Sequence, residues 1–374
     1  MEFYNKAKEF ALKNVSPIAR ELDREGVFPH DIFKKLGEEN YFTLVIPKEY
    51  GGQGKNILEH TEICMALAES SSTVGLCYMM HNVALNVINT YGSDELKKEV
   101  FSKVVNEKKH LTLAYSEFGS GTHFYLPDTT VTKKDENYIL NGTKSMVTSA
   151  NTAAYYLVLS KSTNGDGITN WAVPAESKNL NFLHEHWDGL GMRANVSAPM
   201  EMKDLEISPK YMIGKDGGAM EHVLTAVAPL FIAGLAGVYS GLSMNVSDFA
   251  IKYSQERKYP TSQKLSEIET VQIHLANIYS KATAAKMITL DAARSGANGD
   301  ADALAKILGA RIIASETAIE VSNLGMRVGG GKAYNKKLLV DILLRDAYAG
   351  QIMAPSVDVL KIWLGKALTD QQIP

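Results

Sequence analysis

Near the end of the chain, the stretch from Arg345 to Asp358 (RDAYAGQIMAPSVD) combines polar groups with a helix break. Pro355 cannot continue a helix, because it lacks an N–H and its ring clashes with the preceding turn. It suits the first position of a new helix, whose first turn would then hold Asp358, where the helix dipole favours an anion. The pattern predicts a helix N-terminus opening at 354–356, with unpaired N–H groups. Ala354 and Ser356 supply no base there.

A second stretch that could bind a ligand is the loop Glu117-Phe-Gly-Ser-Gly-Thr, which follows a predicted strand from Leu111. Its backbone N–H groups and small hydroxyls can approach the polar edge of a flat ring closely. Taken alone, the loop is more typical of an ordinary turn.

Other common site signals are absent or weak. The chain has no GxGxxG, GxxxxGK[ST], CxxC or HExxH motif. We expect His184 and His186 on one face of a strand, and because no third ligand is near, we predict no metal site. The glycines in 327–332 (RVGGGK) are typical of a helix C-cap turn.

The elements that must position these residues follow one order along the chain. Apolar residues recur at helical spacing to about residue 110, including a helix after the N-cap Ser93. Residues 111–214 read as strands, with a hairpin around 129–140, and helical spacing then continues to the end. We therefore predict an α+β, mostly α protein: an N-terminal helical domain (1–110), a β domain of barrel or sandwich type (111–214) and a C-terminal four-helix-bundle domain (215–374).

Composition excludes some functions. Thirty-nine basic and 42 acidic residues give a net charge of −3, so we predict neither nucleic acid nor an anionic membrane as partner. Cys64 and Cys77 are too few for a disulfide framework, and with no secretion signal they favour the cytoplasm. The uncharged run 223–247 is long enough to span a bilayer. Its polar residues, and the close-packing Gly234 and Gly241, favour a buried bundle helix.

Six segments together resemble the acyl-CoA dehydrogenase family. The strand and loop around 116–122 resemble that family's TEPxAGSD segment, and residues 141–149 (NGTKSMVTS) its NGxKxWIT segment. Residues 189–197 resemble its GxRxS strand, and 256–260 its ERxxFG signature. Residues 329–331 resemble its GGxG turn, and 344–347 the approach to its catalytic loop. Each match is weak, but six in the right order are specific.

The resemblance implies an FAD between the β domain and the bundle of a homotetramer or homodimer. By matching position, Ser116 is implied to lie beside the flavin pyrimidine edge, Thr148 near flavin N5, and Arg257 at the FAD diphosphate across a subunit interface. The full set of implied cofactor-binding residues is Leu113, Tyr115, Ser116, Met146, Thr148, Arg257, Arg327, Gly330, Gly331 and Ser356. Met146 stands where the family has a Trp. Thr122, Met353 and Ala354 match substrate-binding positions, for an acyl-CoA or related acyl substrate, and electron-transfer flavoprotein is an implied partner.

The chain departs from the family at the reaction itself. Aligned on 345–347, the catalytic Glu falls on Ala354, and the alternative base position falls near Val227. Substrate-contacting Asp and Arg positions fall near Thr225 and Ala228, the loop Asp is His123, and the signature Phe is Pro260. The catalytic residue is therefore unknown. The remaining acid or base candidates are Glu117, His123, Tyr348, Glu221 and His222.

Three functions remain open. The first is a flavin oxidoreductase acting on the Cα–Cβ bond of an acyl thioester, with a relocated base or as an enoyl reductase. The second is a flavin monooxygenase of the same fold, which needs no α-proton base. The third is a catalytically silent subunit of a hetero-oligomeric dehydrogenase. The substrate and its chain length do not follow from the sequence, because a pocket's chemistry and not its fold decides function.

Overall fold

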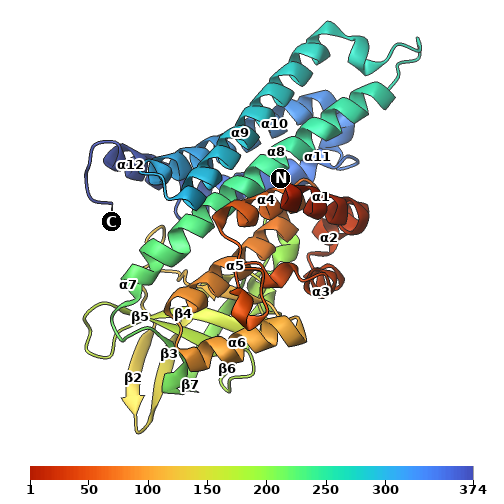
Figure 1. Ribbon diagram of the computed structural model, residues 1–374. Helices are drawn as coiled ribbons and strands as arrows, with labels where there is room; N and C mark the ends of the chain where they lie inside the picture. The colour runs from red at the N-terminus through yellow and green to blue at the C-terminus, as the bar shows by residue number, and fades with distance from the viewer. Residues whose placement is uncertain (374) are drawn as a thin grey trace.

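The computed structural model describes residues 1–373, in which a helical domain, two β-sheets and a long helical bundle follow one another (Figure 1). The first domain comprises α1 (Glu2–Asn14), α2 (Ala19–Glu25), α3 (His30–Glu38), α4 (Ile57–Ala68), α5 (Ser72–Tyr91) and α6 (Asp94–Glu107). As predicted, Ser93 caps α6, and its Oγ accepts a hydrogen bond from the Leu96 N–H at 3.2 Å. That bond satisfies one of the N–H groups that a helix start leaves without a partner.

Within residues 1–373, eight strands form two sheets of four. The first sheet has the order β1 (Leu111–Ala114), β4 (Tyr155–Lys161), β5 (Ile168–Pro174), β8 (Met212–Ile213), and the second β2 (Thr130–Lys134), β3 (Asn137–Val147), β7 (Ala198–Ile207), β6 (Leu180–Phe182). Only the β1–β4 pair is parallel among the described strands. Both sheets contribute to one apolar cluster, centred on the fully buried Trp171 and Tyr156. The predicted β domain is therefore a sandwich.

The bundle begins with α7 (Ala219–His222), a π-helical turn (Val223–Val227) and α8 (Ala228–Glu256), which run on without a break. It continues with α9 (Glu269–Asn298), α10 (Ala303–Tyr334), α11 (Val340–Ile352) and α12 (Val357–Ala367). The outer ends of α8, α9 and α10 lie far from the two sheets, whereas α7 and the start of α8 lie beside them (Figure 1).

The apolar run of α8 packs inside the protein, as predicted. Ala219–Glu256 is long and apolar enough to cross a membrane by length and composition, and 72% of its most apolar window is buried inside the chain. A Cβ on Gly237 would lie 2.8 Å from the Thr61 carbonyl oxygen, and one on Gly241 would lie 2.2 Å from that of Met65. Glycine is thus required for α8 to approach α4 this closely.

Two local predictions were wrong. His184 and His186 lie in a 3₁₀ turn (His184–His186) and not on a strand. Pro355 precedes the next helix and does not begin it, because Ser356 is the N-cap of α12 and accepts from the Val359 N–H at 3.5 Å. The glycine-rich segment interrupts its helix, as predicted. Gly330 has a non-helical backbone with φ 56°, and only a short helical segment follows it, to Tyr334.

Candidate functional site

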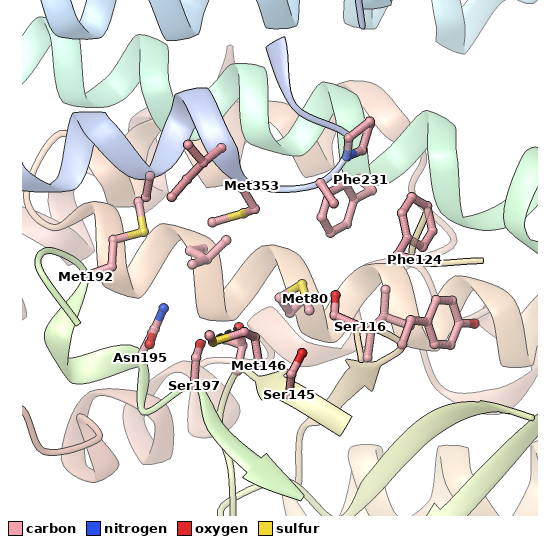
Figure 2. Close-up of a pocket in the computed structure, with 18 of the residues that line it drawn as sticks. Met80, Ser116, Phe124, Ser145, Met146, Met192, Asn195, Ser197, Phe231 and Met353 are labelled. Atoms are coloured by element: carbon pink, nitrogen blue, oxygen red, sulfur yellow. Dashed lines mark hydrogen bonds between the residues drawn. The ribbon is translucent and has the colours of Figure 1, made fainter. Parts of the chain in front are cut away.

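A cavity of about 650 Å³ lies where the three domains meet, a volume typical of small-molecule sites. The β domain, α5, the start of α8 and the α11–α12 connection line it. Figure 2 shows its two sides: Ser145, Met146 and Ser197 come from the β domain, and Met353 and Phe231 face them from the helices. The cavity therefore has a hydroxyl-bearing side and an apolar side.

Helix α11 contributes one continuous face to the cavity wall. Arg345, Tyr348, Ala349, Ile352 and Met353 all line the cavity. Their spacing of three, four, seven and eight residues is that of one side of an α-helix. Ala354 and Pro355, which follow the helix end, line the cavity too, so the 345–358 stretch forms one wall.

The Ala354 backbone N–H donates no hydrogen bond to any group within residues 1–373. Met353, by contrast, donates its N–H to the Ala349 carbonyl oxygen at 3.0 Å and so closes the last turn of α11. This N–H belongs to the connection between α11 and α12, and not to the helix start that the sequence predicted at 354–356. It is free to donate to a ligand oxygen.

The hydroxyl side of the cavity is built by strand ends that are tied together. The Ser145 N–H donates to the Ser116 carbonyl oxygen at 2.8 Å, which joins β3 to the segment after β1. Thr148 and Ser197 share a hydrogen bond of 3.1 Å between their hydroxyl oxygens. The buried Asn195 Oδ1, also in the cavity lining, has no hydrogen-bond partner in the described chain. A buried acceptor without a partner is costly, so this atom favours a ligand that brings a donor.

Glu117 lines the cavity, but its carboxylate is already engaged. It accepts hydrogen bonds from the Asp128 N–H at 2.6 Å and from the Thr129 hydroxyl at 2.6 Å, and it pairs with the Lys144 ammonium at 2.5 Å. Burial would raise the pKa of this carboxyl, but Lys144 and the donors hold it below its usual value. Burial lowers the pKa of Lys144 to about 8 against the pull of Glu117, so the pair is charged at neutral pH. Glu117 is therefore an anchor for the loop and not a free base.

The cation that residues 1–373 contribute to the cavity lining, Arg345, is neutralised in the same way. Arg345 donates two hydrogen bonds to Asp23, at 2.8 and 2.6 Å, and contacts Asp341 at 3.2 Å. This bidentate geometry gives a strong ion pair and fixes the guanidinium. The next residue, Asp346, accepts from the Met192 N–H at 2.6 Å and the Ser72 hydroxyl at 2.8 Å, and burial raises its pKa to about 6. Both residues hold α11 against neighbouring segments.

The structure brings about half of the predicted site residues together. Among residues 1–373, the cavity lining includes Leu113, Tyr115, Ser116, Met146, Thr148, Met353 and Ala354. It does not include Thr122, whose hydroxyl is buried without a partner, or Ser356, which caps α12.

The remaining predicted cofactor residues lie elsewhere on the chain. Arg257 directly follows α8, and its guanidinium lies 5.3 Å from the Tyr259 ring centroid. Arg327, Gly330 and Gly331 belong to the last turns of α10. These helix ends lie at the far end of the bundle from the sheets (Figure 1). The predicted roles of these four residues therefore remain predictions that require a neighbouring subunit.

Of the five acid or base candidates, only Glu117 and Tyr348 line the cavity. His123 hydrogen-bonds the Tyr125 hydroxyl at 2.9 Å, outside the lining. His222 stacks on Tyr91 with ring centroids 4.0 Å apart, and Glu221 accepts from the same tyrosine at 3.3 Å. These three candidates therefore lie outside the cavity lining. The described residues contain no group of three His, Cys, Asp or Glu side chains suited to a metal ion.

Sequence reasoning missed several lining residues. Met80, Phe231 and Trp363 supply apolar cavity wall from α5, α8 and α12. Their helical spacing is the same as that of core residues, so no local signal separates them. Asn195 carried a signal, because it lies in the segment 189–197 that resembles a family strand.

Comparison with known proteins assigns this architecture to a class of flavin-dependent oxidoreductases. Models of the acyl-CoA dehydrogenase N-terminal, middle and C-terminal domains match residues 1–108, 112–205 and 233–369. The chain therefore belongs to the acyl-CoA dehydrogenase family. Members of this family are FAD or FMN flavoproteins, and the predicted FAD is consistent with that.

Individual relatives show how similar the chain is to known members. It is 28% identical over 347 residues to a 3-(aryl)acrylate reductase of Clostridium sporogenes, which covers 91% of this chain and 90% of the relative. The butyryl-CoA dehydrogenase structure from Megasphaera elsdenii superposes with a TM-score of 0.91 at 22% identity, covering 98% and 97%. The structure of TdsC from Paenibacillus sp. A11-2 with FMN and indole superposes with a TM-score of 0.89 at 21% identity, covering 100% and 98%. At these identities, the two structures show a shared fold.

The cavity residues fit a flavin ring. A flavin has a polar edge with an N–H donor and carbonyl acceptors, and a broad apolar face. The unpartnered Asn195 Oδ1 needs such a donor, and the Ser116, Ser145 and Thr148 hydroxyls can serve the acceptors. Met146 and Leu113 offer apolar contact to the ring face. A flavin bound on this side leaves the α11 side of the cavity for a substrate.

Proposed function

We propose that this protein is an FAD-dependent oxidoreductase that reduces the Cα=Cβ bond of an α,β-unsaturated acyl compound. One observation carries the proposal: within the described chain, no free carboxylate or imidazole lines the cavity, because Glu117 is bound by Lys144 and the two histidine candidates lie outside it. The family's catalytic Glu corresponds, by our alignment, to Ala354.

The direction of the proposed reaction, reduction and not oxidation, depends on whether the cavity must remove a proton from the substrate or donate one to it. Oxidation of a saturated acyl compound requires a base to remove the α-proton, and a positioned base contributes about 10²- to 10⁴-fold to such a rate. Reduction requires a proton donor, and hydroxyl groups and water are donors at neutral pH. A bound reduced flavin supplies the hydride. A cavity without a free base therefore supports reduction better than oxidation.

The chain's own groups would orient the substrate. The unpaired Ala354 N–H is a donor for the acyl carbonyl oxygen, which would polarise the adjacent double bond. Phe231, Met353 and Trp363 would contact an apolar or aromatic substituent. An aromatic acrylic unit suits these residues, and the similarity to a 3-(aryl)acrylate reductase supports the same substrate class.

The test uses the purified flavoprotein in anaerobic stopped-flow experiments. The bound flavin is first reduced with dithionite and then mixed with cinnamoyl-CoA, crotonyl-CoA or free cinnamate, and its reoxidation is followed by absorbance. We expect reoxidation within seconds by at least one of the three, with the thioester and free-acid arms defining the substrate form. If the reduced flavin persists with all three, while saturated acyl-CoAs bleach the oxidised flavin, the proposed direction is wrong.

A flavin monooxygenase is the second candidate, and the apolar, base-free cavity favours it. TdsC, a structure of the same fold, is seen with FMN and indole. For this function we expect oxygen uptake and a hydroxylated product when a flavin reductase and NADH are supplied with an aromatic substrate. Uptake that yields only hydrogen peroxide, unaffected by the substrate, would exclude it.

We further propose a cytoplasmic homotetramer or homodimer that exchanges electrons with an electron-transfer flavoprotein. Arg257 and Gly330 lie too far along the bundle to serve their own chain's cavity, which supports a role in a neighbour's site. Both cysteines are buried free thiols, as suits a reducing compartment. Light scattering would establish the assembly, and reoxidation kinetics with the purified electron carrier would establish the partner.

A further inference from the structure

Tyr348 carries a hydroxyl group, which the other α11 residues that line the cavity lack. Tyr348 lies three residues after Arg345 and five before Met353, on the helix face that lines the cavity. Its neighbours on that face are Ala349, Ile352 and Met353, which have no proton to exchange. Tyr348 is therefore the one residue of this face that carries a hydroxyl group.

The other titratable groups of the cavity lining are already engaged. Glu117 is bound by Lys144, and Arg345 by Asp23. The Tyr115 hydroxyl, on the β-domain side, accepts a hydrogen bond from the Asn170 amide at 2.7 Å. Tyr348 makes no side-chain hydrogen bond within residues 1–373 and is 48% exposed. Its hydroxyl is thus free to meet both a ligand and water.

We propose that Tyr348 is the proton donor of the reduction, an inference that rests on the function proposed above. The β-carbon of the substrate receives a hydride from the bound reduced flavin, which is thereby oxidised by two electrons. The Cα=Cβ π-bond breaks, and the α-carbon takes the phenolic proton of Tyr348, so the substrate gains two hydrogens. Water at the exposed side of the ring returns the proton to the phenolate.

This assignment explains how the cavity works without a carboxylate. A carboxyl group is mostly ionised at neutral pH and can remove a proton, whereas a phenol retains its proton and can donate it. The exposed position of Tyr348 also gives the phenolate the solvation that a buried site would deny it.

The experiment compares the holoenzyme with its Tyr348→Phe variant, which removes the hydroxyl and retains the ring. We expect the variant to keep its flavin content and thermal stability, because the hydroxyl has no hydrogen-bond partner within residues 1–373. We expect the rate of reoxidation of the reduced flavin by the unsaturated substrate to fall about 10²-fold, the usual contribution of a positioned acid. A Tyr279→Phe variant on α9, 55% exposed and outside the cavity lining, is the matched control and should react like the parent protein.

A second readout separates proton donation from simple packing. When the reaction runs in D₂O, the parent protein should place deuterium on one face of the α-carbon, as NMR of the product would show. Tyr348→Phe should give a mixture of both faces, because bulk water then delivers the deuteron. Unchanged rate and unchanged single-face labelling in the variant would overturn the role of Tyr348 while leaving the reductase function intact. If the parent protein reduces none of the substrates, it is the proposed function that fails.

Discussion

Replacing Lys144 with Met should destabilise the cavity's β-domain side more than any surface substitution. Lys144 is fully buried, donates to the Leu159 carbonyl oxygen at 2.6 Å and pairs with Glu117, whose side chain is 5% exposed. The variant leaves a buried carboxylate without its cation, which costs about 3–5 kcal/mol when one partner of such a pair is removed. It also leaves the Leu159 carbonyl oxygen without that donor, and the cost of about 3–5 kcal/mol includes this lost hydrogen bond.

The assay for this prediction is thermal unfolding of the holoprotein together with its flavin content. We expect a lower unfolding temperature and weaker flavin retention, because Glu117 anchors the loop directly after Ser116. The double variant Glu117→Gln/Lys144→Met should recover part of the loss, since it removes the unpaired charge.

Lys281→Met provides the matched control for the same assay. Lys281 pairs with Glu320 at 2.9 Å, but both side chains are exposed, so its removal should cost less than about 1 kcal/mol. If Lys144→Met and Lys281→Met unfold at the same temperature, the buried pair does not stabilise the site as argued.

Two further predictions concern the helical domain and the loop beside α11. His60, His81 and His110 are buried, and burial lowers their pKa to about 4, 4 and 3. Histidine in the unfolded chain has a pKa of about 6.5, so the unfolded chain binds protons before the folded one as the pH falls. The free energy of unfolding should therefore decrease between about pH 6.5 and 4. The decrease is up to about 1.4 kcal/mol per pH unit for each histidine. Asp346, with its pKa raised to about 6, gains protons in the native state first and offsets one of them between pH 6 and 4. Denaturation midpoints that do not change between pH 7.5 and 4.5 would contradict this sign. Gly191→Ala should lower both stability and flavin content, because a Cβ there would lie 2.5 Å from the Arg345 carbonyl oxygen. Gly299→Ala should lower stability alone, because alanine is strained at its φ of 72°, while the space around its Cβ is open and the residue lies outside the cavity lining.

The order of the domains was predictable because the helices and strands of each domain follow from the spacing of residues that are close together in the sequence. The Ser93 cap, the 129–140 hairpin and the buried run of α8 depend on residues close together in sequence, and the structure confirms them. The glycines of α8 were informative for the same reason, since a residue without a Cβ signals close approach wherever it lies.

The cavity was predictable only where a family motif marked it. Met80, Phe231 and Trp363 face the cavity because of how α5, α8 and α12 pack, and spacing along one helix does not reveal what the helix packs against. The error at Pro355 has a related cause. Proline and glycine indicate that a helix changes course, but the neighbouring elements decide whether it ends, restarts or kinks.

The most direct test of the central claim measures both half-reactions in the parent protein and in Ala354→Glu. Ala354 lines the cavity, so a carboxylate there would be a base for the α-proton of a substrate bound at the α11 wall. We predict that the parent protein reduces the unsaturated acyl compound but oxidises its saturated counterpart very slowly, and that Ala354→Glu oxidises it about 10²- to 10⁴-fold faster. A parent protein that already oxidises saturated acyl compounds as fast as the variant would contradict the account, because a base would then act in the cavity from another residue.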